Sequence, residues 1–267
     1  MEMLDYEFMK NALYAILIIT PIFGLIGTMI VNNKMAFFSD ALGHSAFTGI
    51  AIGMLLGISN NIVSMIIFAI IFALLLNKIN ASRIASKDTV ISVFSSTAIA
   101  IGLVLLTKNG NYSEISNYLV GDILNIVPKE ITFLSMMAIV VVCFWIFGFN
   151  KLLGMSVNST LAKSKGIPVK FIENIFVILI AVIVMMSIKW IGILIINSLL
   201  ILPAASSRNI SKNMRQYHLW SVIFSIISGI LGLVVSYYLG ISTGPTIVLV
   251  SSVIYFTTFF MRKLSID

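Results

Sequence analysis

An aspartate and a histidine, Asp40 and His44, lie four residues apart in an otherwise apolar stretch, MAFFSDALGHSAFTGIAIG, which covers residues 35–53. On an α-helix, residues i and i+4 share a face, with Cβ atoms ~5 to 6 Å apart. A carboxylate oxygen and an imidazole nitrogen can then bind one divalent cation together. The alternative is a structural pair, in which the aspartate orients a buried histidine by hydrogen bonding. The spacing alone favours neither interpretation.

The surrounding chain is strongly apolar. Of its 267 residues, 59% are hydrophobic and only 10% are charged, whereas soluble domains carry roughly a quarter charged residues. About nine runs approach the ~20 apolar residues that a spanning helix needs, and they lack the alternation of a membrane barrel. The sequence therefore predicts an all-α, polytopic integral membrane protein, with one transmembrane permease domain over residues 1–267.

The predicted spans are separated by short polar connections. They cover residues 9–31, 36–56, 62–76, 89–106, 131–149, 171–188, 191–205, 219–239 and 246–261. The two runs beside Lys189 and Trp190 form either two spans with a tight turn or one broken span. The prediction is therefore eight or nine transmembrane helices.

The basic residues predict the orientation. Thirteen lysines and arginines fall in the connections on one side of the predicted spans and four on the other, so the richer side is cytoplasmic. The N-terminus then lies outside and the C-terminus in the cytoplasm. The net charge of +7 follows from this topology, and no nucleic-acid partner is expected. Asp40 and His44 lie roughly 7 and 13 Å inside the bilayer, where a lipid-facing charge costs ~2.5 to 3.5 kcal/mol, so both should face protein or water.

Several motifs are absent from the sequence. It has no G-x-x-x-x-G-K-[ST] loop for ATP, no H-E-x-x-H or G-x-S-x-G element, and a single cysteine, Cys143, in an apolar run. We therefore expect a non-enzymatic protein without a catalytic residue or a permanently bound cofactor.

Five stretches together resemble the ABC-3 family of metal transporter permeases, the membrane subunits of zinc and manganese importers. They occur in the family's order and cover nearly the whole chain: MAFFSDALGHSAFTGIAIG (35–53), KDTVISVFSSTAIAIGLVLL (87–106), NYLVGDIL (117–124), KWIGILIINSLLILPAASSR (189–208) and GPTIVL (244–249). The resemblance implies an ABC importer permease fold in the bacterial plasma (inner) membrane. It also implies a homodimer, separate cytoplasmic ATPase subunits that hydrolyse ATP, and an extracytoplasmic metal-binding protein.

The resemblance also assigns roles to residues. It implies that Asp40 and His44 bind the metal ion in transit, and that the cytoplasmic segment 150–170 holds a coupling helix that contacts the ATPase. The candidate contact residues in this segment are Leu161, Ala162, Lys163, Gly166, Ile167 and Pro168. Ser95, Ser96 and Asn197 are candidate additional residues of the metal pathway, although each also fits a helix-packing hydrogen bond.

The predicted function is import of a divalent metal ion, with zinc favoured over manganese because the WIGILIINSLLILPAA and GPTIVL stretches resemble zinc-type members. The main alternative is a proton-coupled secondary transporter, in which Asp40 and His44 form a proton relay. A membrane scaffold without transport and an importer of siderophores or cobalamin are further alternatives.

Overall fold

The computed structural model describes residues 2–81, 86–108 and 118–264, and helices account for most of them. Within these ranges, every predicted span falls on a long helix, which confirms the all-α prediction. The long helices are α1 (Glu7–Asn32), α2 (Ala36–Leu55), α3 (Asn61–Ala81), α4 (Lys87–Lys108), α6 (Pro128–Val157), α8 (Val169–Ile191), α9 (Ile193–Ile210), α10 (Met214–Leu239) and α11 (Thr243–Leu264). The shorter elements are α7 (Ser159–Ser164) and the 3₁₀ helices η1 (Glu2–Asp5) and η2 (Ile123–Asn125).

Seven helices within the described residues are long and apolar enough to cross a membrane, namely α1, α3, α4, α6, α8, α10 and α11. Continuous apolar runs of this length satisfy their own backbone hydrogen bonds, which lipid requires. The prediction of a polytopic membrane protein is therefore confirmed. The other two long helices, α2 and α9, coincide with the predicted spans 36–56 and 191–205.

The connection beside Trp190 is a single residue. Helix α8 ends at Ile191, α9 begins at Ile193, and Gly192 between them has φ 90° and ψ 150°. This positive φ is a conformation that glycine adopts without steric cost. The chain thus has two helices here rather than one continuous span.

The chain forms two compact units. The first unit comprises Met1–Asn33, Val120–Ile146 and Trp190–Asp267, and the second comprises Lys34–Leu119 and Phe147–Lys189. Because α6 and α8 each contribute residues to both units, the division does not follow helix boundaries. The single permease domain over residues 1–267 stays a prediction.

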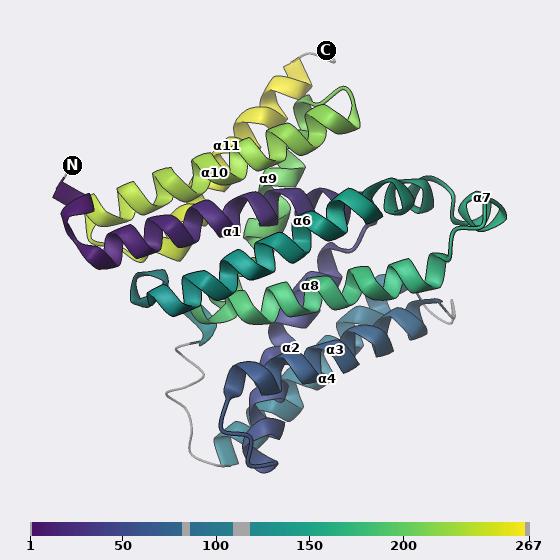
Figure 1. Cartoon of the computed structure of the whole chain (residues 1–267), viewed down its shortest axis with the longest axis horizontal. Helices are drawn as coiled ribbons and strands as arrows, with labels where there is room; N and C mark the ends of the chain where they lie inside the picture. The colour runs from purple at the N-terminus through teal and green to yellow at the C-terminus, as the bar shows by residue number, and fades with distance from the viewer. Residues whose placement is uncertain (1, 82–85, 109–117, 265–267) are drawn as a thin grey trace. The chain divides into compact units, whose positions relative to one another are not determined.

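In the first unit, α1 lies beside α10 and α9, and α11 packs against both of those helices (Figure 1). Buried serines tie α10 to α1: Ser221 Oγ donates to the Gly24 carbonyl at 2.6 Å, and Ser225 Oγ donates to the Thr20 carbonyl at 2.7 Å. Small residues allow this close approach, and hydroxyl-to-carbonyl bonds hold helices together where lipid supplies no competing water.

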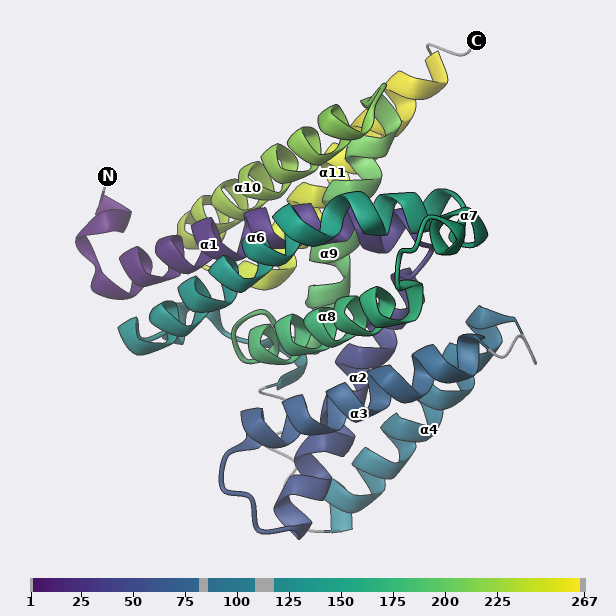
Figure 2. The same cartoon turned by 45° about the vertical axis from the view of Figure 1, so that its right-hand side comes forward.

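In the second unit, α2 packs against both α3 and α4, and these three helices lie together in both views (Figures 1 and 2). Thr48 on α2 donates a hydrogen bond to the Ala98 carbonyl of α4, and Ser64 on α3 donates one to the Gly49 carbonyl of α2. A Cβ atom at Gly102 would lie 2.6 Å from the Thr48 nitrogen. The backbones of α2 and α4 are therefore in contact, and this contact fixes α4 against the helix that carries Asp40 and His44.

Replacing Gly121 with alanine is expected to destabilise the first unit. Gly121 has φ 66°, and an added Cβ would collide with the backbone of Ile191 and Gly192. Gly240 is the matched control, because it has φ 63° and open space around the same position. Both variants incur left-handed strain of ~1 to 2 kcal/mol, but only Gly121→Ala adds a clash of ~1 to 3 kcal/mol. The detergent-solubilised Gly121→Ala protein should therefore melt several degrees below Gly240→Ala, and equal melting temperatures would contradict this packing.

Candidate functional site

Asp40 and His44 lie on the same face of α2, as their spacing predicted. His44 Nε2 and Asp40 Oδ1 are 3.7 Å apart, and the two side chains are 27% and 44% exposed, respectively. Their neighbours on α2, Ser39, Ala41 and Ser45, are buried. Between residues 38 and 51, every residue of α2 is buried except Asp40 and His44.

One face of α4 completes a cavity around this pair. Phe37 of α2 also lines this cavity. The α4 residues that line it recur at helical spacing: Asp88, Ile91, Ser92, Ser95, Ser96 and Ile99. The cavity has an empty volume of about 870 Å³ and is open to solvent. The structure thus brings Ser95 and Ser96 into one cavity with Asp40 and His44.

The sequence reasoning missed Asp88, which lines the same cavity from the first turn of α4. Its side chain is exposed. A signal was present in the sequence, because Asp88, Ser92, Ser95 and Ser96 fall on one helix face. Asp88 brings a second carboxylate to the cavity of Asp40.

The geometry of the pair suits a shared cation. Hydrogen-bonded N and O atoms are about 2.7 to 3.2 Å apart, so the 3.7 Å between His44 Nε2 and Asp40 Oδ1 exceeds a direct hydrogen bond. Two ligands each ~2.1 Å from a tetrahedral ion lie about 3.4 Å apart, close to the observed separation. Among the described residues, no group of three or more His, Cys, Asp or Glu side chains is arranged to hold a metal. Two strong ligands plus hydroxyls or water form an open site rather than a closed cage.

Asn197, the third candidate pathway residue, lies on α9 in the first unit. It is half-buried and has a bonding partner of its own. Asn197 thus belongs to the first unit, whereas Asp40 and His44 belong to the second.

The predicted coupling segment contains a short helix, α7, with well-formed ends. Asn158 Oδ1 accepts hydrogen bonds from Thr160 N and Leu161 N, both at 3.0 Å. At the other end, Ile167 N bonds to the Ala162 carbonyl at 3.1 Å and Gly166 N bonds to the Lys163 carbonyl at 2.9 Å. Those two bonds and the φ of 78° at Gly166 form a Schellman motif.

The side chains of α7 present a mixed surface. Leu161 is 55% exposed and Lys163 is also exposed, whereas Ala162 is buried. Pro168 follows the Schellman turn, and its carbonyl accepts the first hydrogen bonds of α8, from Phe171 N and Ile172 N. The segment is thus a corner with hydrogen-bonded ends, in which α7 exposes the apolar Leu161 next to Lys163 and Lys165.

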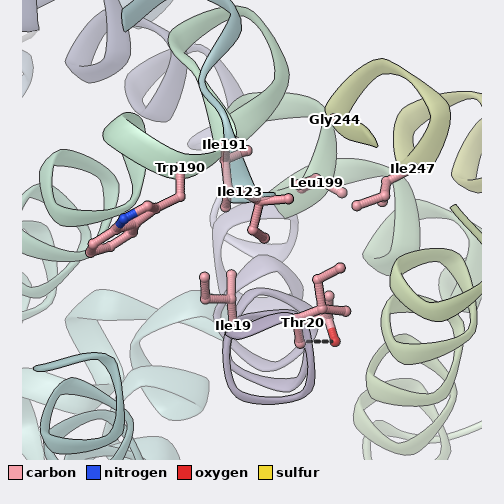
Figure 3. A pocket seen from close by; sticks show the side chains of 9 residues that line it. Ile19, Thr20, Ile123, Trp190, Ile191, Leu199, Gly244 and Ile247 are labelled. Carbon is pink, nitrogen blue, oxygen red and sulfur yellow. Dashed lines mark hydrogen bonds between the residues drawn. The ribbon is translucent and has the colours of Figure 1, made fainter. Parts of the chain in front are cut away.

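A second cavity, in the first unit, is apolar. Figure 3 shows Ile19, Ile123, Leu199 and Ile247 around it, and the hydroxyl of Thr20 donates to the Ile16 carbonyl at 2.8 Å. The indole nitrogen of Trp190, another lining residue, donates to Glu130 Oε2 at 3.0 Å. No His, Cys, Asp or Glu is among the residues that line this cavity, so its lining does not suit a metal ion.

The other histidine, His218, lies on α10 in the first unit. Its Nδ1 is 2.8 Å from Thr28 Oγ1, and its ring packs edge-on against Trp145 at 5.1 Å between centroids. These contacts are those of a helix-packing residue. His218 is not among the residues that line the cavity of Asp40 and His44.

Comparison with known protein families decides the affiliation. The profile of the ABC 3 transport family matches residues 5–262, which is nearly the entire chain. The chain belongs to the ABC 3 transport family. This assignment confirms the family resemblance on which the roles of Asp40 and His44 were inferred.

Relatives within the ABC 3 transport family include proteins named for two metals. The chain is 30% identical to the high-affinity zinc uptake system membrane protein ZnuB of Haemophilus influenzae, over 97% of this chain and 99% of that protein. It is 27% identical to the manganese import system permease protein ScaB of Streptococcus gordonii, over 96% of this chain and 92% of that protein.

The fold is shared with a solved structure. PsaBC from Streptococcus pneumoniae, determined in complex with Fab, superposes with a TM-score of 0.85 at 24% identity, over 97% of this chain and 94% of that one. This likeness confirms the predicted ABC permease fold.

Proposed function

We propose that this chain is the membrane permease of an ATP-driven importer that carries a divalent metal ion into the cytoplasm, zinc in preference to manganese. The observation that carries the proposal is the cavity between α2 and α4, where Asp40 and His44 stand 3.7 Å apart and accessible. Family membership supports transport, and the names of ZnuB and ScaB support zinc and manganese as the cargo.

The preference for zinc rests on the donor atoms. Imidazole nitrogen is a good zinc ligand, whereas manganese favours carboxylate, carbonyl and water oxygens. The Asp40 carboxylate can bind either metal, whereas the His44 imidazole favours zinc, and the serine hydroxyls of α4 or water would complete the shell. Asp88 supplies a second negative charge in the cavity, which would attract either cation toward the pair.

In this proposal, ATP is hydrolysed by separate cytoplasmic subunits that contact the corner formed by α7, Gly166 and Pro168. An extracytoplasmic metal-binding protein delivers the ion, and two copies of the chain form the membrane core. The short, exposed α7 helix supports the first of these contacts, because a rigid corner can transmit motion to the helices on either side of it.

Metal uptake by proteoliposomes tests the proposal. The full chain, reconstituted with its cognate ATPase, should accumulate radioactive zinc when ATP is supplied on the cytoplasmic face, and unlabelled zinc should compete better than unlabelled manganese. Equal uptake with an inactive ATPase variant, together with collapse of uptake on addition of an uncoupler, would instead support a proton-coupled secondary transporter. Better competition by manganese would reverse the metal preference.

Cysteine labelling tests the proposed orientation in the plasma membrane. In a Cys143→Ser background, Lys129→Cys and Ser164→Cys place thiols at exposed positions at the start of α6 and the end of α7. We expect a membrane-impermeant maleimide to label Lys129→Cys in intact cells and Ser164→Cys only after permeabilisation. Labelling of both from the same side would contradict the positive-inside assignment, and with it the N-terminus outside.

A further inference from the structure

The first unit contains a polar pocket where α1 and α9 end and α10 begins. It has an empty volume of about 600 Å³, open to solvent, and is lined by Asn32, Arg208, Ser211, Lys212, Asn213, Met214 and Tyr217. Two of these residues are cationic and none is acidic. The pocket belongs to the unit that does not contain Asp40 and His44, so it is separate from the proposed metal site.

The charge around this pocket is strongly positive. Between Glu173 and Asp267 the sequence has no aspartate or glutamate. Asn209 Nδ2 donates to Thr258 Oγ1 at 3.3 Å, which places the last turn of α11, with Arg262 and Lys263, at the same end of the unit. Five cations therefore gather here: Arg208, Lys212, Arg215, Arg262 and Lys263.

The described acidic residues of the first unit lie toward its opposite end. Tyr6, at the start of α1 beside Glu7, has its ring 6.5 Å from that of Tyr237 at the far end of α10. Glu130 bonds to Trp190, just before α9 begins. Among the described residues of this unit, no carboxylate lies beside Arg208 and Lys212 in the pocket, so an anion from outside the chain can bind there.

Hydrogen bonds hold the pocket's turn in place. Ser207 Oγ donates to the Tyr217 carbonyl at 2.6 Å, and Asn213 Oδ1 accepts from Gln216 N at 2.9 Å. The Lys212 backbone N–H donates to Gln216 Oε1 at 3.0 Å. The backbone that carries the two cations is thus fixed, while the side chains of Arg208 and Lys212 are exposed.

The pocket stands at a boundary between polar and apolar surface. Leu219 and Trp220, in the second turn of α10, are 58% and 37% exposed, and the Trp220 ring stacks on Phe224. Tryptophan is enriched where a membrane's headgroups meet its hydrocarbon. This arrangement puts Arg208 and Lys212 at headgroup level, with apolar side chains continuing from them along α10.

We propose that this pocket binds the phosphate group of an anionic membrane lipid, through Arg208 and Lys212, with the amides of Asn32 and Asn213 as additional donors. Basic pockets between transmembrane helices on the cytoplasmic side have the charge that such headgroups require. The exposed apolar residues of α10 favour a lipid over a free phosphate ion. This inference does not depend on which metal the protein carries.

Lipid binding by the purified full chain tests the proposal. After delipidation in a neutral detergent, the protein should bind phosphatidylglycerol more tightly than phosphatidylcholine, measured by native mass spectrometry. The double variant Arg208→Gln, Lys212→Gln should lose affinity for phosphatidylglycerol by roughly tenfold or more. The matched control is Arg262→Gln, Lys263→Gln, which removes the same charge at the same end but outside the pocket and should bind as the unmodified chain does.

Several results would overturn the proposal. Equal affinity for phosphatidylglycerol in the unmodified chain and the Arg208→Gln, Lys212→Gln variant, or equal losses in both double variants, would reject a specific site. Displacement of the lipid by an excess of inorganic phosphate would assign the pocket to a small anion. Unchanged lipid binding with loss of the ATPase subunits from the variant complex would assign the cations to a protein partner. If the first variant fails to fold, the charge-conserving swap Arg208→Lys, Lys212→Arg should still bind the lipid, and its failure to do so while folded would also count against the site.

Discussion

Asp40→Asn and His44→Ala are each expected to reduce ATP-dependent metal uptake by about 100-fold, while the protein remains in the membrane at near-normal abundance. Loss of even a supporting residue at a metal site costs ~10- to 100-fold, and these two side chains are the proposed direct ligands. Both are partly exposed in the cavity, so removal of one leaves the other in contact with water. Uptake and abundance are measured together, in proteoliposomes and by immunoblot.

The matched control for the metal ligands is Asp88→Asn. This variant makes the same chemical change in the same cavity, but Asp88 lies outside the proposed ligand pair and contributes only a charge at longer range, so uptake should fall by far less. His44→Cys is a second comparison. Because a thiolate suits zinc better than manganese, zinc transport should survive this substitution better than manganese transport.

If Asp40 and His44 form a purely structural pair, Asp40→Asn and His44→Ala should instead lower the abundance of the protein. Each substitution would then leave an unsatisfied polar group, which costs ~1 to 3 kcal/mol. That outcome, or normal uptake, would contradict the metal site.

Replacing Gly166 and Pro168 together with alanine is expected to reduce transport-coupled ATPase stimulation several-fold with little loss of ATPase binding. Gly166 holds φ 78° at the end of α7, where alanine incurs ~1 to 2 kcal/mol of strain. Pro168 fixes the backbone from which α8 starts. Both changes loosen the angle of the corner while leaving the exposed Leu161 and Lys163 available for contact.

The measurement compares ATP hydrolysis in reconstituted complexes with co-purification of the ATPase subunits. Gly154→Ala is the control, because Gly154 lies within α6 with open space around its Cβ position and alanine suits a helix interior. Unchanged stimulation in the Gly166→Ala, Pro168→Ala variant would mean that this segment is a solvated basic loop.

The long helices were predictable because lipid leaves the backbone few alternatives. Apolar runs alone therefore located α1, α10 and the other spans to within a few residues at most ends. The shared face of Asp40 and His44 followed from the helical repeat, which depends only on local geometry.

Tertiary packing could not be predicted in the same way. The contribution of Asp88 depends on α4 lying against α2, which is set by contacts such as that of Gly102 with Thr48. The break at Gly192 likewise depends on one backbone conformation, and a glycine in an apolar run predicts neither a bend nor continuity. The pocket of Arg208 and Lys212 arises only when three helix ends meet.

Because Asp40 and His44 lie one turn apart on one continuous helix, rigid-body motion of that helix leaves the spacing of their backbone positions unchanged. An affinity change during a transport cycle must then come from the groups that complete the coordination shell, such as the hydroxyls of Ser95 and Ser96 on α4 or solvent. The contribution of Asp40 and His44 to ion binding would stay constant through the cycle. The side of the membrane on which the ion is released would depend on which surface beside the pair opens to water.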